Sequence, residues 1–119
     1  MKALFDTNIL IDYLLGVPGA KTELARHPTR LISMVTWVEV LAGARHAADE
    51  DVLEMFLRDF TLVPITRAVA RAAVDLRRVR RVRLPDAMIW ASAQTESALL
   101  VTRNTKDFPA DEPGVRVPY

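Results

Sequence analysis

Short apolar runs alternate with longer amphipathic segments along this chain. The short runs are rich in Leu, Val and Ile and are bounded by polar or turn-forming residues, a pattern typical of buried strands. They predict strands at residues 2–6, 30–33, 61–65 and 98–103, with a possible last strand at 114–119.

The longer segments carry apolar residues at helical spacing. They predict helices at residues 7–16, 19–27, 34–47, 49–60, 67–81 and 85–97. Ser33 and Thr66 directly precede two of these segments, where a hydroxyl can cap the first turn, and Pro85 suits a first helical turn.

This alternation predicts an α/β fold with a central, mainly parallel sheet flanked by helices. Parallel strands bring their carboxyl ends to one edge of the sheet, which is where sites form in such folds. The chain has 119 residues, half of them hydrophobic, and no internal repeat or linker, so we expect one domain over residues 1–119.

Composition excludes several classes of protein. Sixteen Lys and Arg against fifteen Asp and Glu leave a net charge of +1, which rules out nucleic-acid binding through a broad basic field. The absence of cysteine excludes disulfides and thiolate metal sites and fits a reducing cytoplasm. The N-terminus imitates a signal peptide, but Asp6, Asn8 and Asp12 interrupt its apolar stretch, and no run is long enough to span a membrane.

Two acids stand out in the first half of the chain. Asp6 follows the first strand directly and is either a helix cap or a ligand. Glu39 lies in a largely apolar helix with no basic residue within one turn, so we expect it to be largely buried. A buried carboxylate needs a proton, a cation or an arginine from elsewhere in the fold.

Two further acids lie in the second half. Asp86 sits in the first turn of a nearly all-apolar helix, where the helix dipole favours an acid but the helix start also faces the core or a cleft. Asp107 follows the last clear strand, near Thr102 and Asn104, and is either a turn residue or a ligand.

A parallel sheet would gather these four acids at one edge, where they would repel one another. A hard divalent cation relieves that repulsion, and oxygen-only ligands favour Mg²⁺ or Mn²⁺ over Zn²⁺. His27 and His46 have no zinc-site spacing, and we expect both at the surface. Magnesium held by clustered acids indicates phosphoryl chemistry, while the lack of a glycine-rich phosphate loop argues against an NTPase.

Four motifs, in chain order, resemble the PIN-domain family: "LFDTNILIDYL", "ISMVTWVEVLAGA", "LPDAMIWASA" and "LVTRNTKDF". The likeness is greatest to VapC-like toxin ribonucleases of type II toxin–antitoxin pairs. The resemblance implies a three-layer α/β sandwich and a cytoplasmic endoribonuclease that uses Mg²⁺ or Mn²⁺. It also implies an RNA substrate and a cognate antitoxin as partners.

The resemblance also implies roles for individual residues. The catalytic and metal-binding acids are Asp6, Glu39, Asp86 and Asp107, and the accessory polar residues are Asn8, Thr102 and Asn104. Asp107 matches the most variable ligand position, which often acts through water. The chain departs from the family before "LPD", where "RRVRRVR" has no glycine and the segment after Glu39 is short.

An arginine-rich run leads into Asp86. Arg77, Arg80, Arg81 and Arg83, with Arg78 among them, predict a clamp for RNA phosphates or, alternatively, a solvated helix end. The acidic tail of an antitoxin could use the same arginines. Trp37 and Trp90 lie in apolar helices, where core packing is favoured over base stacking.

The apolar faces of residues 7–15 and 52–60 exceed what a small core needs, which predicts a homodimer or cover by an antitoxin helix. Two other functions remain open. A Mg²⁺-dependent phosphatase would use Asp6 as nucleophile, although Asn8 stands where its second acid is expected. A non-catalytic PIN-type module would bind RNA or protein, although all four acids are present.

Overall fold

Five short parallel strands form one sheet in the computed structural model, which describes residues 1–119. They are β1 (Ala3–Phe5), β2 (Arg30–Ser33), β3 (Thr61–Val63), β4 (Leu99–Val101) and β5 (Val115–Arg116). Their order across the sheet is β3-β2-β1-β4-β5, and every neighbouring pair is parallel. The predicted parallel sheet is therefore confirmed, and the carboxyl end of β1 lies at its centre.

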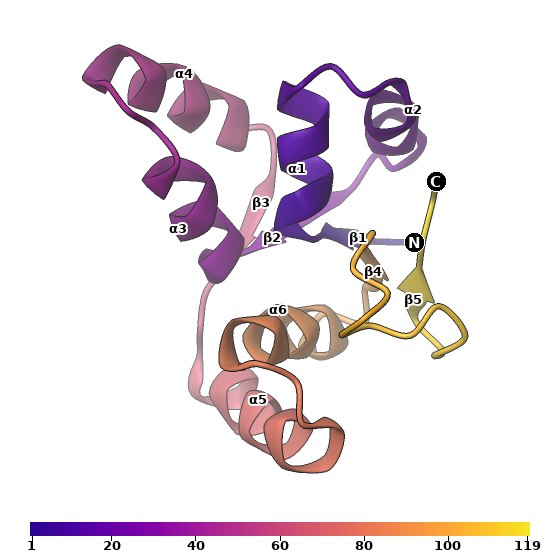
Figure 1. The fold of residues 1–119 in the computed structure, drawn as a ribbon. Helices are drawn as coiled ribbons and strands as arrows, with labels where there is room; N and C mark the ends of the chain where they lie inside the picture. Colours follow the sequence, from indigo (N-terminus) through magenta and orange to yellow (C-terminus); the bar gives the residue numbers. More distant parts are fainter.

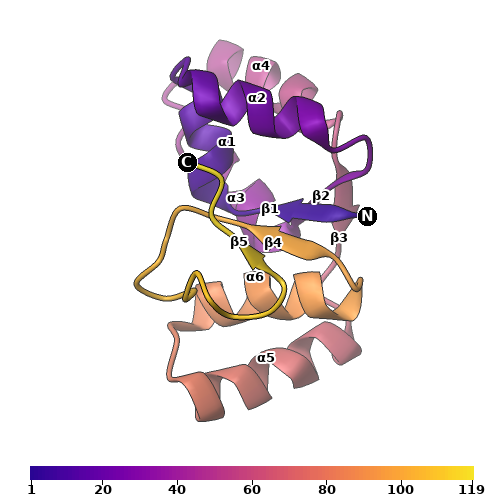
Figure 2. The same cartoon turned by 90° about the vertical axis from the view of Figure 1, so that its right-hand side faces the viewer.

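Six helices cover the two faces of the sheet. They are α1 (Thr7–Leu14), α2 (Pro18–Arg26), α3 (Met34–Ala42), α4 (Ala47–Leu57), α5 (Arg67–Arg80) and α6 (Leu84–Thr95). Helices α1 to α4 pack on one side and α5 and α6 on the other, which gives the expected three layers (Figures 1 and 2). None of these helices has both the length and the apolar character needed to cross a membrane.

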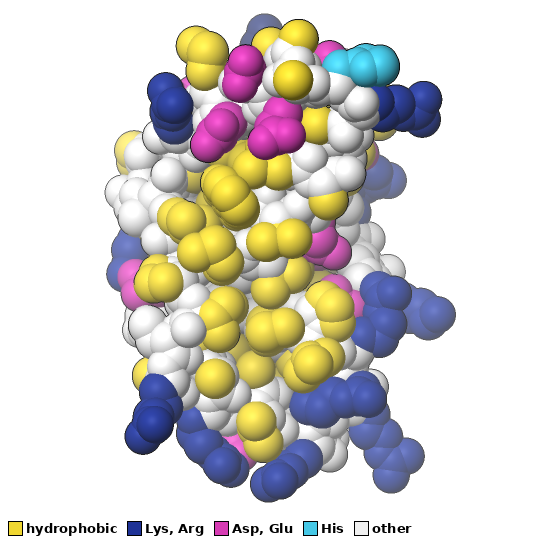
Figure 3. Space-filling model, turned by 90° about the vertical axis from the view of Figure 1, so that its left-hand side faces the viewer, with side chains coloured by type: hydrophobic (Ala, Val, Ile, Leu, Met, Phe, Trp, Pro, Cys, Tyr) yellow, Lys and Arg dark blue, Asp and Glu magenta, His cyan; other side chains and the backbone are white.

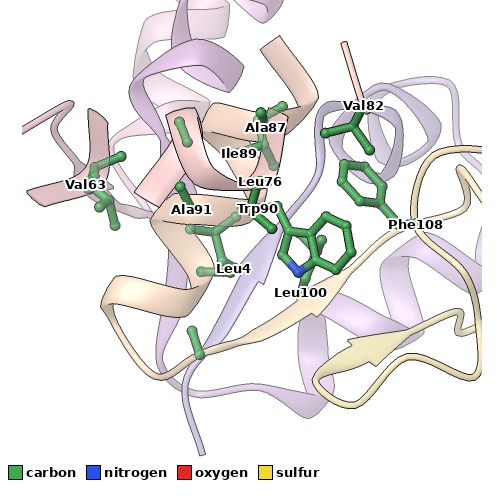
Figure 4. Packing of buried hydrophobic residues seen from close by; sticks show 14 of the residues in the cluster. Leu4, Val63, Leu76, Val82, Ala87, Ile89, Trp90, Ala91, Leu100 and Phe108 are labelled. Carbon is green, nitrogen blue, oxygen red and sulfur yellow. The ribbon is translucent and has the colours of Figure 1, made fainter. Parts of the chain in front are cut away.

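Alternation along each strand divides the core into two clusters. Leu4 faces the α5–α6 layer, whereas its neighbour Phe5 faces the opposite layer. In the first cluster, Trp90 of α6 meets Phe108 nearly edge-on, with ring centroids 5.4 Å apart, beside Leu100 of β4 (Figure 4). The predicted core position of Trp90 is therefore confirmed.

The predicted caps hold their helices as expected. Ser33 Oγ accepts a hydrogen bond from Val35 N at 3.1 Å, and Thr66 Oγ1 accepts one from Val69 N at 3.2 Å. The helix expected over 34–47 ends instead at Ala42, because Gly43 serves as its C-cap and the chain then turns into α4. Glycine weakens a helix interior, so this break occurs where continuing the helix is least favourable.

The prediction that His27 lies at the surface is wrong. Its ring packs edge-on against Phe5, with centroids 5.7 Å apart, and its Nε2 lies 2.8 Å from Glu23 Oε2. Arg116 of β5 also binds Glu23, at 2.6 and 2.9 Å, and holds the pKa of that carboxyl at about 2. These contacts tie α2 to β5.

Candidate active site

Asp6 directly follows β1, the central strand of the sheet, and is the N-cap of α1. Its Oδ1 accepts a hydrogen bond from Thr7 N at 2.8 Å. Its Oδ2 accepts hydrogen bonds from the Thr102 hydroxyl at 2.7 Å and from Asn8 Nδ2 at 3.2 Å. Capping occupies only part of one oxygen, so it leaves Oδ1 a lone pair for a further partner.

Burial raises the pKa of Asp6 above its usual value. The hydrogen bonds from Thr102 and Thr7 oppose that rise, while the nearby charge of Glu39 adds to it. The carboxylate is therefore held in one orientation at a location that favours a proton or a cation beside it.

A chain of hydrogen bonds links Asp6 to Asp107 through the segment after β4. Thr102 donates to Asp6 and accepts a hydrogen bond from Asn104 N at 2.9 Å. Asn104 Nδ2 donates to Asp107 Oδ2 at 2.9 Å, and this bond lowers the pKa of Asp107. Thr102 and Asn104 thus orient two of the four acids, and Asp107 stays ionised near neutral pH.

Asp86 lies in the first turn of α6 and is only 8% exposed. Burial is the main cause that raises the pKa of Asp86 to about 6. Asp107 contributes to the rise as a hydrogen-bond partner and as a charge, and the charge of Asp6 adds to it, while Arg83 opposes it. Asp86 is therefore surrounded by other acids at the same edge of the sheet.

The prediction that Glu39 is buried is wrong. Helix α3 turns Thr36 and Val40 toward the interior and leaves Glu39 exposed. Its protein partner is the Thr7 hydroxyl, which lies 2.7 Å from Oε1. Because water solvates this carboxylate, Glu39 needs no buried counter-cation.

Thr7 joins Glu39 to Asp6, and the sequence reasoning assigned it no role in the site. Its amide binds Asp6 and its hydroxyl binds Glu39, while the same hydroxyl lies 3.0 Å from that of Thr36. The signal was its position between Asp6 and Asn8, since the first residue of a helix that starts at a strand end must lie beside the cap.

Arg83 contacts two of the acids directly. Its Nη2 lies 3.1 Å from Asp86 Oδ2 and 3.5 Å from Asp107 Oδ2, although its side chain is 75% exposed. The charge of Asp86, followed by that of Asp107, raises the pKa of Arg83. An arginine expected to bind RNA thus lies across the Asp86–Asp107 pair.

The other predicted arginines differ in their surroundings. Arg77 donates to the carbonyl of Val82 at 2.7 Å and so holds the turn after α5. Arg80 pairs with Glu112 and lies over the ring of Trp90, 5.4 Å from its centroid. Arg81 is exposed and has no ion-pair partner; with Arg80, Lys106 and Asp107 it lines a hollow of about 250 Å³.

The acids form two linked pairs, Asp6 with Glu39 through Thr7 and Asp86 with Asp107 through Arg83. As they stand, no three acidic or histidine side chains lie close enough together to hold a metal ion. The surrounding donors are nevertheless carboxylate, hydroxyl and amide oxygens, which hard divalent cations prefer. This set of oxygen ligands, without thiolate or imidazole, fits Mg²⁺ or Mn²⁺.

Comparison with known proteins gives a consistent result. A family model described as PIN domain matches residues 3–110. Ribonuclease VapC10 of Mycobacterium tuberculosis is 37% identical over 117 residues, covering 92% of this chain and 87% of its own. A chain in a toxin–antitoxin complex from Klebsiella pneumoniae is 45% identical with a TM-score of 0.93, over 99% of this chain and 98% of that one.

A more distant likeness concerns the fold alone. A chain of VapBC2 from Rickettsia felis, solved with a fragment of promoter DNA, is 22% identical. Its TM-score is 0.81, and the match covers 98% of this chain and 96% of that one.

Proposed function

This chain belongs to the PIN-domain family, and we propose that it is a metal-dependent endoribonuclease and the toxin of a toxin–antitoxin pair. The observation that carries the proposal is the presence of two linked pairs of acids, Asp6 with Glu39 and Asp86 with Asp107, at the carboxyl edge of a parallel sheet. The ribonuclease and toxin–antitoxin names of relatives at 37% and 45% identity support it.

We assign the metal ligands to Asp6, Glu39, Asp86 and Asp107, with Asp107 acting through water. A bound Mg²⁺ or Mn²⁺ would lower the pKa of a water beside the scissile phosphate and stabilise the negative charge that develops there. Relatives of the VapC type generally require a divalent metal, and the oxygen-only donors favour these two ions.

The chain's own residues orient the reacting groups. Thr7, Thr102 and Asn8 hold Asp6 in place, and Thr7 also holds one oxygen of Glu39. The other oxygen of Glu39 is open to water, so Glu39 can orient the water that attacks. Asp86, with a pKa of about 6, is mostly ionised at neutral pH, so its carboxylate is available to a cation.

RNA phosphates would bind in the hollow beside Asp107. Arg81 and Lys106 are exposed and unpaired there, and Arg80 lies at its wall. Arginine presents several N–H groups to a phosphate at once, which suits a single-stranded backbone. We leave Arg77 out of this set, because its guanidinium holds the Val82 carbonyl.

Apolar surface beside the site suits the two protein partners. Figure 3 shows a band of apolar side chains between an acidic and a basic end, and Met34, Val38, Ile65 and Met88 line a hollow of about 330 Å³ that includes Glu39. We propose that the cognate antitoxin covers this hollow, and that a second copy of the chain covers the exposed face of α1 and α4. With a cellular RNA as substrate, we propose that the protein acts in the cytoplasm.

The test is cleavage of total RNA by the purified protein in Mn²⁺, with the new 5′ ends mapped. Asp6→Asn, Glu39→Gln and Asp86→Asn should each lower the cleavage rate by on the order of a hundredfold, because each removes a carboxylate from the site. Asp75→Asn is the matched control, since Asp75 pairs with Arg71 on the exposed side of α5.

Near-native cleavage by a folded Asp6→Asn protein would refute the metal site. Hydrolysis of small phosphate esters without RNA cleavage would favour the phosphatase. RNA binding in chelator, with no cleavage in Mn²⁺, would favour the binding module.

A further inference from the structure

Arg83 is the N-cap residue of α6, yet its side chain makes no capping hydrogen bond. Its Nε lies 3.2 Å and its Nη2 3.1 Å from Asp86 Oδ2, and the same Nη2 reaches Asp107 Oδ2 at 3.5 Å. Neither acid has another ion-pair partner. The guanidinium therefore lies between two of the carboxylates that would hold a metal ion in the proposed site.

We propose that Arg83 is a resident counter-cation of the Asp86–Asp107 pair, which a divalent cation must displace, and that the displaced guanidinium then binds an RNA phosphate. The inference rests on the proposed ribonuclease function, because it concerns the same acids. It assigns to Arg83 a role in setting the metal affinity of the site.

Displacement of Arg83 by a divalent cation is favourable because one guanidinium balances only part of the negative charge of Asp86 and Asp107. The Arg83 side chain is 75% exposed and lies 3.1 Å from Asp86 but 3.5 Å from Asp107, so a single solvated positive charge is shared between two carboxylates. Exposed ion pairs are weak, and a divalent cation, which carries twice the charge and prefers carboxylate oxygens, would compete well against them. Arginine keeps its proton at any physiological pH, so it leaves the acids only by moving away.

Once displaced from the acids, the Arg83 side chain lies close to the proposed binding site for RNA phosphates. Arg83 lies two residues from Arg81, which lines the hollow beside Asp107 together with Lys106. A divalent ion on the acids repels the guanidinium, whereas an RNA phosphate at this edge attracts it. By linkage, RNA that holds Arg83 away from the acids also favours metal binding.

The experiment measures Mn²⁺ binding to the purified protein without RNA, by the electron paramagnetic resonance signal of free Mn²⁺. Arg83→Gln should bind Mn²⁺ about three- to tenfold more tightly than the parent, because no guanidinium has to be displaced. Arg78→Gln is the matched control, since Arg78 is exposed on α5 without an ion-pair partner, and its affinity should stay at the parent value.

Thermal melts give a second readout. In chelator, Arg83→Gln should melt below the parent because Asp86 and Asp107 lose their counter-cation, and in millimolar Mn²⁺ this deficit should disappear or reverse. Arg78→Gln should show the same small difference from the parent in both conditions. If Arg83→Gln does not fold, Arg83→Lys takes its place, because an ammonium cannot span both acids; its Mn²⁺ affinity should rise by a smaller factor.

Unchanged or weaker Mn²⁺ binding by Arg83→Gln, or by Arg83→Lys in its place, overturns the inference and leaves the proposed function intact. An equal gain for Arg78→Gln also overturns it, since the cause would then be net charge alone. Failure of parent and variants alike to bind Mn²⁺ overturns the metal site of the proposed function as well.

Discussion

Asp6 and Asp86 are aspartates in helix-start positions that usually stabilise a fold, yet both have raised pKa values. The cause is burial at an edge where other carboxylates already lie, so ionising either one costs free energy in the metal-free protein. An asparagine at either position avoids that cost, and at position 6 it keeps an oxygen for the amide of Thr7. An Asp→Asn substitution at either position should therefore raise the free energy of unfolding in chelator and lower it in the presence of metal, each relative to the parent.

Asp86→Asn tests this reversal. In chelator at pH 7 the variant should be more stable than the parent by about 1 kcal/mol, because one pKa unit is worth ~1.4 kcal/mol and the lost Arg83 pair offsets part of the gain. In millimolar Mn²⁺ the order should reverse, since only the parent gains the full stabilisation of metal binding. Thermal melts in both conditions measure the two differences, and equal destabilisation in both would mean that Asp86 only stabilises the first turn of α6.

The pH dependence in chelator has a definite sign. The pKa of Asp86 is about 6 in the folded protein against an ordinary 3.8, so between these values the folded state binds more protons than the unfolded state. The parent should therefore lose stability relative to Asp86→Asn as pH rises from about 4 to about 6. Glu23, with its pKa lowered to about 2, has the opposite dependence, but it is present in both proteins and cancels in the difference.

At the scale of elements, the turn from α5 to α6 joins the arginines to the acid site. Arg81 adopts a left-handed conformation there, with φ of 57°, and its amide bonds to the Arg77 carbonyl at 3.1 Å. Glycine is the relaxed residue for such a helix end, and an L side chain costs roughly 1–2 kcal/mol. Arg81 stands where glycine is expected, so its backbone conformation lowers the stability of the fold. Its side chain lines the hollow beside Asp107.

Arg81→Gly should therefore raise the free energy of unfolding by about 1 kcal/mol and weaken RNA binding at the same time. Denaturant melts measure the first effect, and RNA binding at several salt concentrations, in the non-cleaving Asp6→Asn protein, measures the second. Loss of one phosphate contact should reduce the salt slope by roughly 0.7.

Arg78→Gly is the control, because it puts glycine inside the last turn of α5 and should destabilise by about 1 kcal/mol. A salt slope unchanged by Arg81→Gly would show that Arg81 is a solvated helix end with no part in RNA binding.

At the scale of the whole molecule, α1 and α4 expose more apolar surface than the core needs. Tyr13 and Phe56 stack between the two helices, with centroids 5.2 Å apart and planes within 8°. Around them Ile11, Leu14, Leu15, Val52 and Met55 are exposed. Exposed apolar side chains on two packed helices favour association with a second copy.

The prediction at this scale is a homodimer that depends on α1 and α4. Leu15→Glu and Met55→Glu should each shift the purified protein toward monomer, because each would bury a charge in the interface. Sedimentation equilibrium across a concentration series measures the shift, and Val79→Glu, at a 78% exposed position on α5, should leave the parent behaviour unchanged. A parent that is monomeric throughout the series contradicts the proposed dimer.

Features that depend on residues close together in the chain could be predicted from the sequence. Strand and helix positions follow from the period of apolar residues, and the Ser33 and Thr66 caps from a hydroxyl just before a helix. Asp6 was singled out because the end of the first strand is itself predictable, whereas its place at the centre of the sheet came from the structure. Motifs spread over nearly the whole chain then indicated the family.

Features that depend on which side of a helix faces its neighbours could not be predicted from the sequence. Glu39 is exposed because α3 turns Thr36 and Val40 inward, and one residue of rotation reverses the environment of a side chain on a helix. His27 is held by Glu23, whose other partner Arg116 comes from a strand at the far end of the chain. Arg83 reaches Asp107 only because α6 packs beside the segment after β4, so its partner follows from the distance between packed elements and from no local pattern.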